Sequence, residues 1–381
     1  MPTRITDLAE SIIISTGSFV PIVDANESIN SKNKKISVND LRKYFYLNGN
    51  NSSSFTRHTP GLYYFGDNSD GPGNFSGSIT TLRTRISASF ASTQDGVPVI
   101  KNFSNLFISR SVVISPTNRC RGLLIFVDGD ATISGSLRMT GRGAKFTGSD
   151  ASFSTINPPY LGDYWSTQLF PSASYLSRVF AVGASGGTFS VNANGNPGSA
   201  GTLGRSGGGG GGGTPSPGFG GGAGGAGSSF SGGTGGGGAV APIGGTDGRS
   251  FGGTGGVGAP SGAGGGAGNP SGSGGTPIGA TDGTGGLLIL IVRGNLRIGP
   301  NGSIASLGST GGGSPASPTF IGGGGSGGGI IYVYYGGTLT NNGTVAATGG
   351  SGGPSVTRSG GAGGAGTAII SKLNVAFPVG N

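Results

Sequence analysis

Glycine is the residue that most constrains how this chain can fold. It accounts for 89 of the 381 residues, against an average usage of about 7%, and residues 186–286 are almost all Gly with Ala, Ser, Thr and Pro. Such a segment has no side chains from which to build a core. A glycine run can instead adopt the polyproline-II conformation, with three residues per turn and no internal hydrogen bonds. Glycine helices can pack side by side where the facing residues lack a Cβ, so the sequence predicts a polyglycine-II bundle with Ala at outward or rim positions.

Two features favour order over disorder in this half. Charged residues make up only 10% of the chain and hydrophobic residues 33%, whereas disordered chains are usually rich in charge. The glycine tracts are also interrupted by the apolar runs GLLILIV and GIIYVYY. These runs would aggregate unless they were buried in a folded structure.

An internal repeat begins at Gly122, Gly286 and Gly329. Each copy reads as an apolar strand, a turn, a short alternating strand and then a glycine tract. The apolar runs are too continuous for strands with one wet face, which predicts burial on both faces. The final stretch, GTAIISKLNVAFPVG, reads as a truncated copy that closes the array. In the three copies, the predicted turns correspond at Gly129, Gly294 and Gly336, and the predicted alternating strands correspond at Ile133, Ile298 and Leu339.

Residues 1–48 form a small N-terminal module. TGSFVPIVDA and KKIS read as strands, and SVNDLRKYFYL reads as a short helix with Ser37 as its N-cap. A helix this short cannot stand alone, so it needs a partner or a docking surface. The candidate attachment residues are Phe19, Val20, Ile22, Ile36, Val38, Leu41 and Phe45.

The fold class predicted from these patterns is all-β, with β-strand repeats combined with a polyglycine-II helix bundle. Residues 1–48 are expected to form the attachment module, residues 49–185 a β-rich middle domain, and residues 186–381 the glycine bundle with interleaved apolar strands. Within the middle domain, residues 76–121 alternate in short segments that are typical of β-strands.

Non-glycine residues cluster where the glycine tracts would turn. Pro, Phe, Ile and Asp on otherwise bare turns are what a recognition surface would carry. The phenylalanines could equally plug the ends of the bundle, and both interpretations stay open. The candidate receptor-binding residues are Pro217, Phe219, Phe230, Ile243, Asp247, Phe251, Ile278, Asp282, Pro318 and Phe320.

Two regions resemble bacteriophage proteins. FVPIVDANESINSKNKKISVNDL is similar to N-terminal segments of phage tail and fibre proteins, and the glycine-rich half resembles the polyglycine-sandwich adhesins that tip the long tail fibres of some T-even-type phages. GLLIFVDGDATISGSLRMTGRGA also resembles a recurring segment of glycine-rich phage structural proteins. The resemblance implies attachment to other virion proteins through the N-terminus. It also implies binding of a host receptor, a polysaccharide or an outer-membrane protein, through loops of the C-terminal half.

Residues suited to catalysis are scarce. His58 is the only histidine and Cys120 the only cysteine, so the chain has no zinc-site spacing and no Ser–His–Asp arrangement. Asp128 and Asp130 are candidates for paired carboxylates but suit a turn with Asx hydrogen bonds better. Asp247 and Asp282 could ligate Ca²⁺, although an ordinary turn role is favoured. We expect no enzyme activity, no cofactor and no metal.

Charge and hydropathy limit the partners further. The net charge is +9, but no dense basic run with interleaved aromatics supports nucleic-acid binding. No stretch reaches the roughly 20 apolar residues of a membrane span. We expect a virion tail protein made in the host cytoplasm without a signal peptide. A homotrimer is expected because the N-terminal module is small and exposed apolar strands would gain by meeting their copies. The alternatives are a non-receptor structural or head fibre, or a bacterial glycine-rich surface adhesin.

Overall fold

The computed structural model describes most of the C-terminal three-quarters of the chain and two short strands near the N-terminus. The described residues are 19–22, 34–37, 65–66, 68–77, 86–145, 187–188, 193–201, 206–214, 221–227, 231–238, 266–268, 272, 283–313 and 321–373. They fall into two compact units, Met1–Pro60 and Gly61–Asn381. The described residues contain strands and no helix, so the prediction of an all-β fold is confirmed.

The first unit contains the two strands predicted from the sequence. β1 (Phe19–Ile22) and β2 (Lys34–Ser37) pair antiparallel, with Val20 opposite Ile36. Of the candidate attachment residues, Phe19, Val20 and Ile22 lie in β1 and Ile36 lies in β2. Ser37, predicted to cap a helix, is the last residue of β2, and the helix residues Val38, Leu41 and Phe45 lie outside the described residues.

The second unit is built on three parallel five-stranded sheets. Sheet I contains β5 (Val99–Phe103), β8 (Leu123–Val127), β11 (Leu287–Val292), β14 (Ile330–Tyr335) and β17 (Thr367–Lys372). Sheet II contains β3 (Gly73–Phe75), β6 (Leu106–Ile108), β9 (Ala131–Ile133), β12 (Leu296–Ile298) and β15 (Leu339–Asn341). Sheet III contains β4 (Ile86–Phe90), β7 (Val112–Pro116), β10 (Ser136–Arg138), β13 (Ser303–Ala305) and β16 (Thr344–Ala346).

The chain visits sheets I, II and III in turn and then returns to sheet I one strand further along. This connectivity makes a three-faced parallel β-solenoid, in which one circuit is a rung and each rung contacts its neighbours. Inward side chains from all three sheets form one core, for example Leu290 from sheet I, Ile108 from sheet II and Ile114 from sheet III. The residues expected to form separate middle and glycine-rich domains lie in one unit and share these sheets.

The apolar strands β8, β11 and β14 of sheet I are buried on both faces, which confirms the prediction from their continuous apolar runs, whereas the edge strand β17 is only partly buried. Every residue of β8 and β11 is buried. In β11, Leu288 and Leu290 face the solenoid core, whereas Ile289 and Ile291 pack in a second cluster with Tyr332. A strand with one wet face would have needed polar residues at alternate positions.

The internal repeats stack as successive rungs. Leu290 lies between Ile125 and Val333, and β17 pairs with β14, so the truncated final copy does extend the array. One detail of the alignment was wrong: Leu339 pairs with Leu296, and the partner of Ile298 is Asn341.

The turn of the third copy shifts in the same way. Gly337, rather than Gly336, donates its backbone N–H to Gly294. The buried strands set the register, and with Tyr335 opposite Val292, Gly336 takes the place of Arg293.

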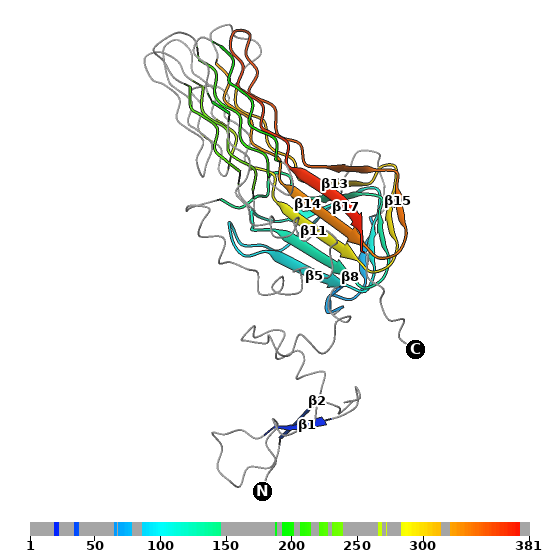
Figure 1. The fold of residues 1–381 in the computed structure, drawn as a ribbon. Coiled ribbons are helices and arrows are strands. Elements are labelled where there is room, and N and C mark those ends of the chain that lie inside the picture. The colour runs from blue at the N-terminus through cyan, green and yellow to red at the C-terminus, as the bar shows by residue number, and fades with distance from the viewer. Residues whose placement is uncertain are drawn as a thin grey trace, which may run out of the picture. The chain divides into compact units, whose positions relative to one another are not determined.

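All the glycine tracts are insertions at one corner of the solenoid, between sheet III and sheet I. This corner is spanned by residues 117–122 after β7, but by residues 139–286, 306–329 and 347–366 after β10, β13 and β16. Within this unit the tracts run away from one end of the strands and back again (Figure 1). We call this part the glycine extension.

Candidate functional site

Backbone hydrogen bonds in the glycine extension repeat every three residues. Segment 206–214 lies in the interior, and its successive N–H groups donate to three different neighbouring segments in rotation, with N···O distances of 2.8 to 3.2 Å. Gly207, Gly210 and Gly213 donate to Gly328, Gly325 and Gly322; Gly208, Gly211 and Thr214 donate to Ser199, Asn196 and Ala193; Gly209 and Gly212 donate to Gly225 and Gly222.

The carbonyl groups of the same segment accept from three further segments. The donors include Gly233, Gly364 and Gly187, so segment 206–214 is hydrogen-bonded to six neighbours. A Cβ at Gly210 would fall on the carbonyl oxygen of Gly361, and one at Gly207 on that of Gly364. Gly207 and Gly210 therefore cannot be replaced by a residue with a Cβ unless the neighbouring segments shift.

Segments at the rim carry side chains at every third position. In residues 347–354, Thr348, Ser351 and Pro354 are exposed, whereas Gly350 and Gly353 are buried. The prediction that Ala takes outward positions is confirmed for Ala226, Ala362 and Ala365, which are exposed. Ala267 is an exception, because it is completely buried.

Two buried serines cross-link the first and second long glycine tracts, a role that the sequence did not reveal. Ser326 is completely buried; its hydroxyl donates to the carbonyl of Gly283 at 3.0 Å and accepts from the N–H of Ser309 at 2.7 Å. Ser306 donates to the carbonyl of Gly286, directly before β11, at 2.6 Å. For Ser326 the available signal was a serine with glycine runs on both sides; Ser306, between Ala305 and Leu307, has no such signal.

Residues 355–358 form the turn between the outgoing and returning halves of the last glycine tract. The Ser355 hydroxyl accepts from the N–H groups of Thr357 and Arg358, both at 3.1 Å. Nη1 of Arg358 donates to the Thr357 carbonyl at 2.8 Å, and the exposed fraction of Val356 is 61%. Ser359 donates its N–H to Oδ1 of Asn194 in a neighbouring segment at 3.0 Å. This turn is therefore ordered and presents an apolar side chain.

The candidate receptor-binding residues all lie outside the described residues, so their predicted role stays a prediction. They are Pro217, Phe219, Phe230, Ile243, Asp247, Phe251, Ile278, Asp282, Pro318 and Phe320. Their described neighbours differ in position. Ile321, which follows Phe320, forms an isolated β-bridge with Arg358 of the turn at residues 355–358. Ser231, which follows Phe230, forms one with Gly286, directly before β11 of the solenoid.

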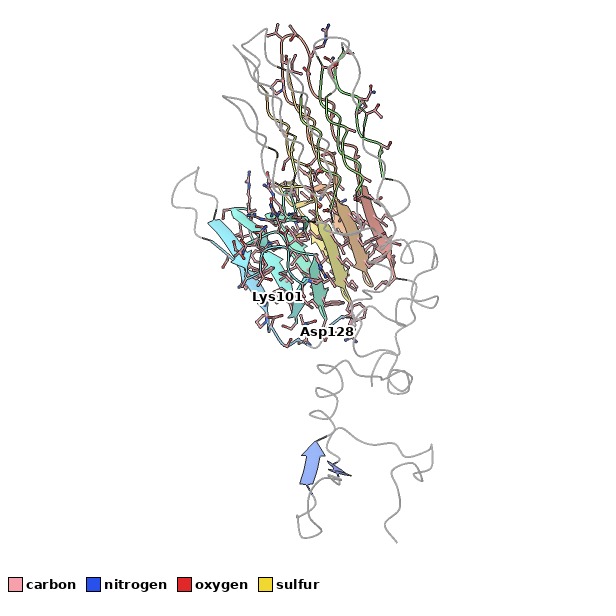
Figure 2. All side chains as sticks on the ribbon, turned by 90° about the vertical axis from the view of Figure 1, so that its left-hand side faces the viewer. Lys101 and Asp128 are labelled. Carbon is pink, nitrogen blue, oxygen red and sulfur yellow. The ribbon has the colours of Figure 1, made fainter. Side chains whose placement is uncertain are left out.

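Side chains are crowded around the sheets and sparse along the glycine extension, and they reappear at its far end (Figure 2).

Two ion pairs involve residues in or directly after the strands of sheet I. Nζ of Lys101, in β5, lies 2.7 Å from Oδ1 of Asp70. Asp128 pairs with Nη1 of Arg293 at 2.9 Å and accepts from Nδ2 of Asn68 at 3.0 Å.

The corner between sheets I and II carries a ladder of Asx side chains. Oδ1 of Asn105 accepts a hydrogen bond from the backbone N–H of Asp130 at 3.0 Å. On the next rung, Oδ1 of Asp130 accepts from the backbone N–H of Asn295 at 2.6 Å. Oδ1 of Asn295 in turn accepts from the backbone N–H of Thr338 at 2.9 Å. Asp130 therefore does lie in a turn, but its hydrogen bond reaches the next rung rather than its own backbone. The carboxylates of Asp128 and Asp130 therefore both bond to residues of the next rung, Arg293 and Asn295.

A second polar cluster surrounds Asp95. Its carboxylate bonds Nε and Nη2 of Arg119, both at 3.2 Å, and accepts from the N–H of Lys145 at 2.7 Å. Burial raises the pKa of Asp95, but these hydrogen bonds and the Arg119 charge outweigh it and hold the pKa below its usual value. Nearby, burial raises the pKa of the Cys120 thiol, which favours its neutral form.

Within the described ranges, no group of three His, Cys, Asp or Glu side chains could hold a metal ion. No helix long and apolar enough to cross a membrane occurs in this part of the chain. Comparisons with protein-family models, with characterised proteins and with solved structures found no match to this chain.

Proposed function

We propose that this chain is a bacteriophage tail-fibre protein that binds the host cell surface through loops at the end of the glycine extension. The observation that carries the proposal is the three-residue period of the hydrogen bonds around segment 206–214. A bundle cross-linked in this way is a regular support that can present loops between its segments, as it presents the described turn at residues 355–358.

The glycine tracts are proposed to be polyglycine-II helices. A three-residue period of donors, side chains exposed at every third rim position and bonds running only between segments are the features of that conformation. Ordering glycine costs more backbone entropy than ordering any other residue. Bonds to six neighbours in the interior, together with the apolar rungs that anchor each tract, offset this cost.

Loop presentation is the second part of the proposal. The described turn at residues 355–358 has its backbone hydrogen-bonded by Ser355 and displays Val356 to solvent. A pre-ordered loop loses little entropy on binding. The partner is proposed to be a host polysaccharide or outer-membrane protein, bound without catalysis, cofactor or metal.

Attachment to the virion is assigned to residues 1–48, which belong to the separate unit Met1–Pro60. The homotrimer remains part of the proposal, but one argument for it falls away. The apolar strands β8 and β11, expected to be exposed to neighbouring copies, are buried within this chain. Trimerisation therefore rests on the N-terminal module.

Host binding can be tested with the purified full-length protein. It should bind cells of the host bacterium and block infection by the phage, and the double substitution Val356→Ser with Arg358→Ser should weaken both effects. Val97→Ser, at an exposed valine before β5, is the matched control. If the wild-type protein neither binds cells nor blocks infection, the receptor-binding function is wrong and a structural or head fibre is favoured.

A further inference from the structure

The outward face of sheet II carries one column of side chains that the solenoid core does not use. Asn74, Phe107, Thr132, Arg297 and Thr340 occupy the same position in five successive strands. In β6, β9 and β12 the column residue lies between two buried residues, as Phe107 does between Leu106 and Ile108. In the edge strand β15, Thr340 lies between the half-buried Leu339 and the exposed Asn341. The column therefore faces outward along the whole height of the solenoid.

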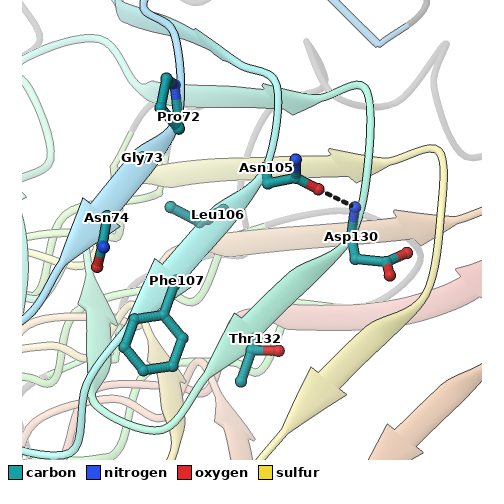
Figure 3. A pocket seen from close by; sticks show the side chains of 8 residues that line it. All are labelled: Pro72, Gly73, Asn74, Asn105, Leu106, Phe107, Asp130 and Thr132. Atoms are coloured by element: carbon teal, nitrogen blue, oxygen red, sulfur yellow. Dashed lines mark hydrogen bonds between the residues drawn. The ribbon is translucent and has the colours of Figure 1, made fainter.

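A shallow, open hollow of about 320 Å³ lies at the end of this column formed by β3, β6 and β9. Phe107 and Thr132 project side by side from neighbouring strands, with Asn74 on one side and Asp130 on the other (Figure 3). The hydrogen bond between Asn105 and Asp130 holds the rim in place at 3.0 Å.

Phe107 is unusual among the aromatic residues of this chain. Its exposed fraction is 42%, and it is the only exposed aromatic side chain among the described residues. By contrast, Phe75, Phe90 and Phe103 pack edge to face or tilted against one another inside the solenoid. At this outward position the Phe107 ring adds nothing to the core. It lies in a hollow whose other outward side chains, Asn74, Asp130 and Thr132, are polar, so the hollow offers one apolar face surrounded by hydrogen-bonding groups.

We propose that the hollow around Phe107 binds a sugar unit of a glycan chain that runs along the column. The C–H face of a pyranose ring is apolar and its rim is hydroxylated, so it can stack on Phe107 while its hydroxyls reach polar side chains. The amide of Asn74 and the hydroxyl of Thr132 supply donors and acceptors, and no hydrogen bond within the described part of the chain occupies either side chain.

Arg297 gives the site a preference for acidic glycans. It is exposed and lies two strands beyond Phe107 in the column, which corresponds to about 10 Å at the usual strand spacing. A carboxylate or other acidic substituent further along the bound chain would reach its guanidinium group. This binding face is separate from the distal loops and does not depend on their function.

The geometry favours a glycan over a peptide or a nucleic acid. A peptide that adds a strand needs a free sheet edge, but β6, β9 and β12 each have a partner on both sides. A nucleic acid needs several cations for its phosphates, whereas the column contains one cation, Arg297, and the rim of the hollow carries the carboxylate of Asp130.

An array of neutral and acidic bacterial oligosaccharides, probed with the full-length protein, tests the proposal. Wild-type protein should be retained on at least one glycan, and Phe107→Ser should reduce its affinity for that glycan about tenfold or more. Thr132→Val should weaken binding to the same glycan, and Arg297→Gln should weaken binding to acidic glycans only. Val97→Ser, at another exposed apolar position that does not line the hollow, should bind like wild type.

Thermal unfolding of each variant separates a lost site from a lost fold. Retention of no glycan by the wild type, or equal retention by Phe107→Ser, would overturn the proposal. Binding to a peptide array that depends on Phe107 would overturn it as well, in favour of a protein partner. Cell binding by the distal-turn variants is a separate measurement, so the proposed function and this site can fail independently.

Discussion

At the scale of single residues, the glycine extension contains two kinds of position: some have no space for a Cβ and need glycine, and others can carry a small side chain that points into solvent. Interior positions such as Gly210 have a carbonyl group where a Cβ would be. Rim positions such as Ala362 point into solvent. The sequence pattern predicted that Ala would sit outward but did not indicate which tract was central, since 206–214 becomes central only through its six neighbours.

Gly210→Ala should therefore destabilise the protein far more than a change of similar size at the rim. The added methyl group collides with the carbonyl of Gly361, and overpacking of this kind typically costs about 1–3 kcal/mol. Ala362→Ser, the control, should stay within about 0.5 kcal/mol of wild type. Urea unfolding measures both, and equal stability of the two variants would contradict the tight packing of the bundle.

Asp95 should make the folded state sensitive to acid. Because its pKa is lowered in the folded protein, its contribution to stability is present above the unfolded-state pKa of about 3.9. That contribution is lost as the pH falls further towards the folded-state pKa. Asp95→Asn should lower stability at neutral pH and flatten the decline below about pH 4. Melting temperatures between pH 2.5 and pH 7 test this, and an unchanged acid limb in the variant would show that Asp95 is not responsible.

At the scale of elements, the solenoid rungs are equivalent in sequence pattern but not in burial. Leu296 and Leu339 occupy the same position in adjacent strands, yet Leu296 is completely buried whereas Leu339, in the last strand of sheet II, is only half-buried. The repeat predicts both as core residues. The difference arises because β15 has a neighbour on one side only.

Leu296→Ala should cost about 2–5 kcal/mol, in the range of buried leucine truncations. Leu339→Ala removes the same atoms from a site that solvent already reaches and should cost less than half as much. Chemical denaturation of the two variants gives the comparison. Equal losses would mean that the last rung is as well covered as the interior ones.

The Asx ladder is a second property of the elements that the sequence did not reveal. Asn295→Ala removes the acceptor for the N–H of Thr338 and should destabilise the protein by about 1 kcal/mol. Asn74→Ala removes an exposed amide that makes no hydrogen bond within the described residues, and it should be neutral for stability. A neutral Asn295→Ala would show that the corner is held by backbone bonds alone.

At the scale of the whole molecule, the division into Met1–Pro60 and Gly61–Asn381 means that the proposed attachment and presentation roles can be tested separately. The three sheets and the glycine extension belong to the second unit and share no strand with the first.

Removing residues 1–60 should leave a folded protein that no longer trimerises or enters virions. Light scattering should give about three times the chain mass of 36.8 kDa for the full-length protein and a single-chain mass for the truncated one. A full-length mass near 36.8 kDa would rule out the trimer. A trimer that survives truncation would place the contacts in the solenoid or the extension instead.

The sequence by itself determined the all-β class, the repeating strands, the burial of both faces of β8, β11 and β14, and the outward position of alanines such as Ala362. These follow from local composition and periodicity, since a continuous apolar run must be covered on both faces and a Cβ cannot fit between packed glycine backbones. Only the tertiary structure showed that the repeats form a three-faced solenoid with every tract inserted at one corner. Strand register, the Asx ladder and the Phe107 column depend on pairs of residues such as Asp130 and Asn295, which are 165 positions apart. Such pairings depend on how the rungs stack, and the periodicity of either segment alone contains no record of its partner.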